Sequence, residues 1–460
     1  MRLRIYRWVH RLFFEPIAEA VAFQKWGSDR SRELARVPEG PGTVCLGQEP
    51  HFNSHVWFHA ASVGELESLW TVIEAWIEKG GRVSVSIFSK SAEKSLAKLK
   101  TALAQRSSQI VYFGYSPWEG RWGDFLKRYS PDVFVTAKYE AWPELWLSLA
   151  HQEVPLVIVG AKKRSSYRFA QRMCGLLGGQ IPRIHFLSVS SADADALADA
   201  LKDRFEAASV RVIGEPRWDR VSRRLENSPG NSEVAKIVKD YELLPKPWGV
   251  LGSAWIEDLQ VWKDSLREFL GKEASGTLWV VPHRIDPSYL AQVERFLGEQ
   301  GFEISRSSLG FGGFGGFEGF KGFKGFKGFK QGAGKPVVLI DQMGFLAELY
   351  SYADWAYVGG GFGKGVHSTI EPALQAIPIA VGPARIESFS EISQLKEAGI
   401  LSVVNNAQEL KTWVSRVRGL RNTEGGDALR VKWREEISKK LGATQGVVSV
   451  IEEIVRVKRK

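Results

Sequence analysis

Cysteine and methionine are scarce in this sequence. Of its 460 residues only two are cysteine, Cys45 and Cys174, and three are methionine. So few cysteines exclude a disulfide-stapled scaffold and favour a reducing compartment such as the cytoplasm. No cysteine–histidine cluster has the spacing of a structural zinc site, so we expect no metal ion.

Long apolar runs are absent as well. No uncharged apolar stretch approaches the ~20 residues that span a bilayer, and Arg7 and Arg11 interrupt any signal-peptide pattern. Arginines alternate instead with aliphatic and aromatic residues up to Phe14, before the first acid at Glu15. We predict that residues 1–50 form a basic amphipathic segment that associates with an anionic membrane surface. The alternative is that this segment packs on its own domain.

Acidic residues are outnumbered by basic ones, 52 to 62, which gives a net charge of +10. This excess indicates a negatively charged partner, such as nucleic acid, anionic lipid or a phosphorylated substrate, unless it only keeps the surface soluble. Because no nucleic-acid-binding motif occurs, we expect no nucleic-acid partner.

The length suits two domains of about 200 residues. Short buried strands alternate with helix-like stretches, which predicts an α/β fold with parallel strands and crossover helices. We expect strands at 56–60, 82–88, 110–113, 132–136, 155–159, 186–190 and near 212, and then at 249–252, 277–281, 337–340, 355–358, 379–381 and 402–404.

The proline-containing polar stretch 227–246 is typical of an interdomain linker. It separates a first domain, residues 51–226, from a second, residues 247–460. Two such halves imply a cleft, with ligands at the carboxyl ends of the strands.

A low-complexity insert interrupts the second half at residues 310–334, where phenylalanine recurs every third residue among glycine and lysine. Glycine opposes a helix here, whereas a polyproline-II-like chain would align the phenylalanines for contact with lipid or another chain. The simpler interpretation is a loop expansion without function.

A glycine-rich loop follows the predicted strand 355–358, and a helix is expected to start near Ser368. Glycines allow close approach of a ligand, and a helix start favours phosphate. Glu371, on the first helical turn, can accept hydrogen bonds from ribose hydroxyls. The alternative is a tight strand–turn–helix connection without a ligand.

Glu65 stands where the first strong strand ends and a helix begins. A carboxylate at this place can act as a general base toward a hydroxyl. However, Ser62-x-x-Glu65 is also a capping box, and Ser368-x-x-Glu371 repeats the pattern. Taken alone, each pattern favours a helix cap.

Several motifs nevertheless occur together, in one order, between residues 57 and 398. They lie at 59–65, 138–143, 214–220, 252–258, 341–350, 357–371 and 381–389. In this order they resemble the 3-deoxy-D-manno-octulosonic acid (Kdo) transferases, which add Kdo to lipid A precursors.

The resemblance implies a GT-B glycosyltransferase with two Rossmann-like domains that face each other across a cleft. The first domain would bind the acceptor, a lipid A precursor such as lipid IVA, and the second the donor, CMP-Kdo. Transfer would invert the anomeric carbon without a metal or cofactor, in lipopolysaccharide synthesis at the cytoplasmic face of the inner membrane.

The resemblance also assigns roles to residues. Glu65 would be the catalytic base, with Ser62, Gly64 and Glu140 on the acceptor side. Arg217 would reach a phosphate or the Kdo carboxylate, unless it forms an interdomain salt bridge. The remaining donor-binding candidates are Ser253, His283, Arg284, Gly359, Gly360, Gly361, Lys364, Ser368 and Glu371.

The sequence departs from the common family pattern at three places. Residues 366–368 read Val-His-Ser where many members have Gly-His-Asn, residues 282–284 read Pro-His-Arg where many have Pro-Arg-His, and 162–164 are unusually basic. Two alternatives therefore stay open: a GT-B transferase for another CMP-ulosonic acid, or a non-catalytic binder of nucleotide or anionic membranes. An oxidoreductase is disfavoured because the first loop lacks Gly-x-Gly-x-x-Gly.

Overall fold

The computed structural model describes Tyr6 and residues 54–138, 140–202, 205, 208–227, 232–242, 244–269, 276–309, 336–420 and 423–458. The chain forms two compact units, Met1–Arg220 with Lys440–Lys460, and Val221–Lys439. Apart from Tyr6, the expected membrane segment 1–50 lies outside the described residues, as does the insert 310–334.

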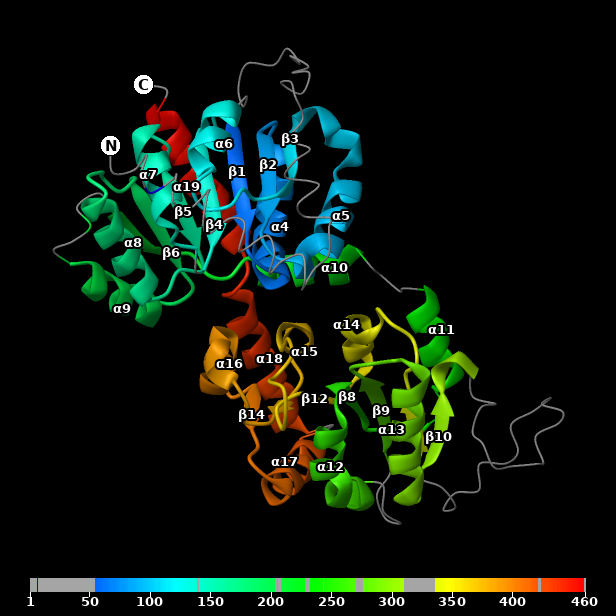
Figure 1. Cartoon of the computed structure of the whole chain (residues 1–460). Helices are drawn as coiled ribbons and strands as arrows, with labels where there is room; N and C mark the ends of the chain where they lie inside the picture. Colours follow the sequence, from blue (N-terminus) through cyan, green and yellow to red (C-terminus); the bar gives the residue numbers. More distant parts are fainter. Residues whose placement is uncertain are drawn as a thin grey trace. The chain divides into compact units, whose positions relative to one another are not determined.

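The first unit contains a seven-stranded parallel sheet in the order β3-β2-β1-β4-β5-β6-β7 (Figure 1). Its strands are β1 (His55–Ala60), β2 (Arg82–Ile87), β3 (Ile110–Tyr115), β4 (Val133–Ala137), β5 (Leu156–Val159), β6 (Ile184–Ser188) and β7 (Ala208–Val212). The predicted strands are confirmed, except that β7 ends near the position where we expected it to begin. Gly214, with φ +99°, and Pro216 follow it in the exit loop.

Helices cover both faces of this sheet because residues along each buried strand alternate between two cores. Val56 and Phe58 face one core and Trp57 the other. The first core includes α4 (Val63–Glu78), α5 (Glu93–Ala102) and α19 (Ala443–Lys458). The second includes α6 (Trp122–Tyr129), α7 (Pro143–His151), α8 (Ser165–Leu176) and α9 (Ser191–Leu201).

The C-terminal helix α19 belongs to the first unit, whereas we expected the second domain to extend to residue 460. Asp219 accepts hydrogen bonds from the backbone N–H groups of Gly442 and Thr444, both at 2.6 Å, at the start of α19. The Thr444 hydroxyl lies 2.7 Å from that of Thr71 on α4. A carboxylate satisfies the unpaired N–H groups of a helix start, so Asp219 fixes α19 against this sheet.

The second unit repeats the architecture, with a parallel sheet in the order β10-β11-β9-β8-β12-β13-β14. Its strands are β8 (Trp248–Ala254), β9 (Thr277–Pro282), β10 (Glu303–Arg306), β11 (Pro336–Leu339), β12 (Trp355–Val358), β13 (Ile379–Val381) and β14 (Leu401–Val403). One core includes α12 (Ile256–Phe269), α13 (Pro287–Glu299) and α17 (Ala407–Gly419). The other includes α11 (Ser232–Asp240) and α14 (Leu346–Leu349).

The remaining helices connect these layers. They are α10 (Arg217–Asn227), which contains the boundary between the units, α15 (Ile370–Leu374), α16 (Ser390–Glu397) and α18 (Glu424–Ser438). Short 3-10 turns occur at Lys90–Ala92, Ala104–Gln109, Ser307–Leu309, Tyr350–Tyr352 and Ile386–Ser388.

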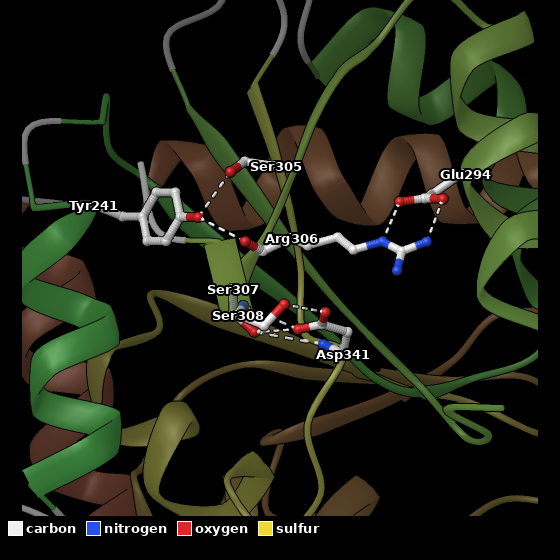
Figure 2. Close-up of polar contacts among 7 residues, drawn as sticks. All are labelled: Tyr241, Glu294, Ser305, Arg306, Ser307, Ser308 and Asp341. Atoms are coloured by element: carbon white, nitrogen blue, oxygen red, sulfur yellow. Dashed lines mark hydrogen bonds and ion pairs between the residues drawn. The ribbon is translucent and has the colours of Figure 1, made fainter. Parts of the chain in front are cut away.

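Side chains hold the edge strand β10 where the insert leaves it (Figure 2). Arg306 forms two hydrogen bonds with Glu294 on α13, at 2.6 and 2.7 Å. The Tyr241 hydroxyl lies 2.8 Å from that of Ser305. Asp341, which follows β11, accepts a hydrogen bond of 2.9 Å from the Ser307 hydroxyl. The edge of the sheet is thus tied to its neighbours on both sides of the insert.

Because β10 and β11 are parallel, with Glu303 opposite Pro336, the chain between them must return along the whole strand. Such crossovers need about a dozen residues. Direct deletion of residues 310–334 leaves only 307–309 and 335 for the return. We therefore refine the expectation that the insert is dispensable: its length matters, whereas its Gly-Phe-Lys sequence does not.

We predict that replacing residues 310–334 by a Gly/Ser linker of about 12 residues leaves the melting temperature within about 2 °C of wild type. Direct deletion should lower it by roughly 5 °C or more, because β10 loses its place in the sheet. Thermal unfolding followed by circular dichroism compares the two. Equal destabilisation of both variants would show that the repeat itself stabilises the fold.

Candidate active site

Three buried carboxylates gather at the carboxyl edge of the first sheet. Glu65 lies on the first turn of α4 after β1, Glu140 follows β4, and Glu215 follows β7. Only 5%, 8% and 5% of their respective surfaces are exposed. Parallel strands bring their carboxyl ends to one edge, which is where ligands bind in such sheets.

Glu65 is held through one oxygen only. Its Oε2 accepts a hydrogen bond of 2.6 Å from the backbone N–H of Ala61. Ser62 is the N-cap residue of α4, but its hydroxyl forms no cap hydrogen bond. Neither bond of the predicted capping box is therefore formed, and Glu65 accepts the Ala61 N–H in place of that of Ser62. Within the described part of the chain, no group hydrogen-bonds to the other oxygen, Oε1, which is left to accept a proton.

The two neighbouring carboxyl groups have opposite pKa shifts. Burial, together with the charge of Glu140, raises the pKa of Glu65 to about 7, against the Ala61 N–H and the charges of His59 and Lys138. Burial also acts to raise the pKa of Glu140, but the nearby His59 imidazole and the hydrogen bond from the Trp142 indole N–H lower it overall. Glu140 thus stays ionised while Glu65 exchanges a proton near neutral pH.

His59 is a site residue that the sequence analysis missed. Its side chain is buried on β1, with Nδ1 2.9 Å from the Ser86 hydroxyl and Nε2 3.7 Å from Glu140 Oε2. The sequence signal that could have found it is a polar residue within the otherwise apolar predicted strand 56–60. This imidazole lies against the Glu140 carboxylate and helps to hold it.

Lys138 and Glu215, also not predicted, form an ion pair at the same edge, with Lys138 Nζ 3.6 Å from Glu215 Oε2. The Lys138 carbonyl accepts a hydrogen bond of 2.6 Å from the Tyr167 hydroxyl on α8. Burial opposes ionisation of Glu215, but Lys138 and Arg217 lower its pKa overall. Arg217, predicted to bind the donor, belongs to the first unit and stands beside Glu215.

In the second unit, the glycine-rich loop is packed against the backbone of neighbouring segments. A side chain at Gly359 would come within 3.0 Å of the Ser253 carbonyl, and one at Gly361 within 3.0 Å of Gly382. Gly360 has φ +90°. The tight-turn alternative thus accounts for all three glycines without a ligand. The Gly359 N–H donates to Gly252 at 2.8 Å; Gly361 keeps an N–H that no described residue accepts.

Asp258, in the first turn of α12, organises this loop and was not singled out from sequence. Its carboxylate is fully buried. It accepts hydrogen bonds from the N–H of Gly360 at 2.7 Å, the N–H of Trp255 at 2.9 Å and the Tyr357 hydroxyl at 2.8 Å. Burial raises its pKa against the effect of these donors. Both oxygens are engaged, so Asp258 holds structure and has no oxygen left for a substrate proton.

The helix after the loop, α15, starts at Ile370, two residues beyond Ser368, and has only five residues. Glu371 does lie on its first turn, and the Ser368 hydroxyl donates to the Glu371 carboxylate. The N-cap Thr369 forms no side-chain cap hydrogen bond. The predicted contact between Ser368 and Glu371 is thus present, but as a side-chain pair and not as a capping box.

An aromatic stack brings further predicted residues to this edge. The His283 ring lies 4.4 Å from that of Trp255 and 4.3 Å from that of His367, and Lys364 Nζ lies 4.3 Å over Trp255. Burial lowers the pKa of His283, as do the charges of Lys364 and Arg284. His283 is therefore neutral at pH 7 and supplies no cation. Lys364 and Arg284 are the positive groups here.

Two predicted residues have constraints of their own. Ser253 adopts a left-handed conformation, φ +52°, where the pairing of β8 with β9 is irregular. Arg284 lies 2.9 Å from Asp286 and helps to line a surface pocket of about 380 Å³ with Tyr289, Gln292 and Arg295. Among the residues described, no group of three histidine, cysteine or acidic side chains is arranged to hold a metal.

Comparison with known proteins identifies the family. The sequence profile described as "3-Deoxy-D-manno-octulosonic-acid transferase (kdotransferase)" matches residues 27–220. A 3-deoxy-D-manno-octulosonic acid transferase of Chlamydia pneumoniae is 43% identical over 356 residues, 74% of this chain and 71% of that protein. The chain belongs to the Kdo transferase family. It is therefore a glycosyltransferase, as the ordered motifs predicted.

More distant Kdo transferases cover more of the chain. The Haemophilus influenzae protein is 23% identical over 418 residues, 86% of each chain. Among solved structures, a UDP-GlcNAc 2-epimerase from Neisseria meningitidis has a TM-score of 0.58 at 12% identity, over 87% of this chain and 100% of that one. A glycosyltransferase from Rickettsia africae has a TM-score of 0.56 at 11% identity, over 88% and 99%. These likenesses confirm the predicted GT-B fold class.

We predict that Glu65→Gln raises the free energy of unfolding at pH 8 by roughly 2–3 kcal/mol and leaves it unchanged at pH 4. The folded pKa of Glu65, about 7, lies above the ordinary 4.5. The stability that protonated Glu65 contributes to the wild type is therefore fully present below pH 4.5 and is lost as pH rises through 7. Urea unfolding at both pH values measures the difference.

Glu67→Gln is the matched control, because Glu67 lies on the same helix and pairs with Arg220 at the surface. It should show no gain at pH 8. If Glu65 were only a helix cap, its replacement would cost about 1 kcal/mol at both pH values, which is the opposite sign at pH 8.

Proposed function

We propose that this Kdo transferase moves Kdo from CMP-Kdo to a lipid A precursor, lipid IVA, with inversion at the anomeric carbon. The arrangement of Glu65 carries the proposal. Its carboxyl group is buried, has a pKa of about 7, keeps one oxygen without a described partner and lies beside an ionised carboxylate. Such a group is suited to accept a proton from a sugar hydroxyl.

On the acceptor side, Glu65 takes the hydroxyl proton while the hydroxyl oxygen forms the new bond to the anomeric carbon. The bond to the CMP phosphate breaks on the opposite face, so the configuration inverts and CMP leaves as an anion. Glu140, which His59 and Trp142 keep ionised, sustains the basicity of Glu65. Ser62 and Gly64, at the start of α4, flank the acceptor hydroxyl.

On the donor side, the developing phosphate charge needs fixed donors and cations. The N–H of Gly361 and the charges of Lys364 and Arg284 supply them in the second unit, with Ser253 at the adjoining strand end. We also propose that Arg217 contacts a phosphate or the Kdo carboxylate. The Ser368–Glu371 pair takes the ribose hydroxyls, since a carboxylate accepts two such bonds.

The acceptor is a lipid, so we place the enzyme at the cytoplasmic face of the inner membrane as a peripheral protein. The net charge of +10 supports attraction to anionic lipid. No helix in the described ranges combines the length and hydropathy of a membrane span.

The proposal predicts that wild-type protein, incubated with CMP-Kdo and a tetraacylated lipid A precursor, yields adducts that mass spectrometry resolves by the number of Kdo units. Glu65→Gln should lower kcat at least 100-fold, because general-base catalysis is lost. Affinity for CMP, measured by calorimetry, should stay within about twofold, since Glu65 is assigned to the acceptor.

Glu67→Gln again serves as control and should keep transfer near wild type. Activity in wild type should also rise with pH through about 7, as Glu65 loses its proton. Undiminished transfer by Glu65→Gln would refute the role of this carboxylate.

A further inference from the structure

The outer face of α8 carries an exposed mixture of cationic and apolar side chains. Phe169 and Leu176 are 59% and 65% exposed, although large apolar residues are ordinarily covered. Arg172 lies between them on the same stripe, at spacings of three and four residues, with Arg168 beside it. The opposite stripe, Tyr167, Ala170 and Cys174, is buried in the core and holds the helix in place.

The sequence of this region carries only positive charge, although Lys162 pairs with Asp193 of α9 at 3.9 Å. No acidic residue occurs between Glu153 and Asp193, and the basic run 162–164 leads directly into α8. Among the described residues, none forms an ion pair with Arg168 or Arg172. Together with Ser165, Ser166 and Phe169, these two arginines line a shallow hollow of about 640 Å³. Such a surface complements an anionic partner that also offers apolar contact.

The stripe starts at the edge that bears Glu65. Helix α8 follows β5, the neighbour of β4 in the sheet, and Tyr167 donates to the carbonyl of Lys138. Lys138 is two residues before Glu140. A partner lying along α8 therefore reaches the carboxyl edge of this sheet, where the acceptor hydroxyl is proposed to react.

One contact of the N-terminal segment points to the same side. The Tyr6 hydroxyl donates to Glu119 Oε1 at 3.1 Å, and the same oxygen accepts the N–H of Glu144 on the first turn of α7 at 2.7 Å. Helices α7 and α8 are neighbours on one face of the sheet (Figure 1), and the Cys174 thiol lies 3.6 Å from the carbonyl of Pro143 on α7. The Tyr6 side chain is thus held beside α7, the neighbour of α8.

We propose that the outer stripe of α8, formed by Arg168, Phe169, Arg172 and Leu176, docks the first unit on an anionic lipid bilayer. The arginines contact headgroup phosphates while Phe169 and Leu176 enter the interfacial layer. A lipid surface fits better than nucleic acid or an acidic protein, because the two arginines alternate with large apolar side chains. The inference deepens the proposed function, whose acceptor resides in a membrane, but it is tested by binding alone.

The test is sedimentation of the full-length protein with vesicles of phosphatidylcholine containing about one-third phosphatidylglycerol. The double variant Arg168→Gln/Arg172→Gln should lower the partition coefficient roughly 10- to 30-fold, since each basic residue near such a surface contributes about fivefold. Phe169→Ser should lower it roughly three- to tenfold on anionic vesicles. Circular dichroism verifies that each variant is folded.

Helix α18 of the second unit provides matched controls, with exposed Lys432 and Arg434 and with Val431, which is 53% exposed. Lys432→Gln/Arg434→Gln and Val431→Ser should bind vesicles as wild type does. An equal loss in the α8 and α18 variants would reduce the effect to net charge and overturn the proposal. Wild-type binding by the α8 variants, or a loss limited to DNA or an acidic polypeptide, would overturn it too.

Activity separates this inference from the proposed function. The α8 variants should transfer Kdo to acceptor dispersed in detergent at near wild-type rates, but should lose transfer to acceptor embedded in vesicles. If wild type transfers no Kdo in either form, the proposed function fails while vesicle binding by α8 stands. If the α8 variants retain transfer to embedded acceptor, docking through α8 is refuted.

Discussion

The parallel direction of the strands is the constraint from which the rest of this structure follows. A parallel sheet must be covered on both faces, so its strands are nearly continuous apolar runs and its connections are long crossovers. Every strand then ends at the same edge, and the loops at that edge are free to carry polar chemistry. In the first unit these loops hold Glu65, Glu140 and Glu215, which come from positions far apart in the sequence. Their convergence is a product of topology.

Once two carboxyl groups share this buried edge, electrostatics divides their roles. Two adjacent buried carboxylates do not ionise equally, and the group with more donors keeps the charge. Glu140 has His59 and Trp142, whereas Glu65 has the single N–H of Ala61. The proton therefore resides on Glu65 up to about pH 7. His59, which lies beside Glu140, thereby helps to set the pH at which Glu65 loses its proton.

Features encoded by a local sequence pattern were predicted, whereas features that depend on contacts between distant residues were missed. Apolar runs located the strands, because a strand buried on both faces needs no partner to be recognised. The amphipathic pattern of α19 does not say which sheet it covers; Asp219, more than 200 residues upstream, does so through its bonds to Gly442 and Thr444. The role of Asp258 likewise could not be predicted from sequence, because it depends on the hydrogen bond from the distant Gly360 N–H. The glycine-rich loop was recognised correctly, but its glycines are required by the close approach of the neighbouring backbone at Ser253 and Gly382.

The two units place an acid at the same point, on the first helical turn after the first strand of the unit, and use it differently. Asp258 follows β8 as Glu65 follows β1; β8 has three strands on each side in its sheet, whereas β1 has two on one side and four on the other. Asp258 receives N–H or O–H donors on both oxygens, so both oxygens are occupied in holding the glycine-rich loop although burial raises its pKa. Glu65 receives one donor and lies beside a second carboxylate, so one of its oxygens has no described partner and its pKa is raised. The number of donors around the carboxylate, and not its position in the fold, therefore separates a structural acid from a candidate base.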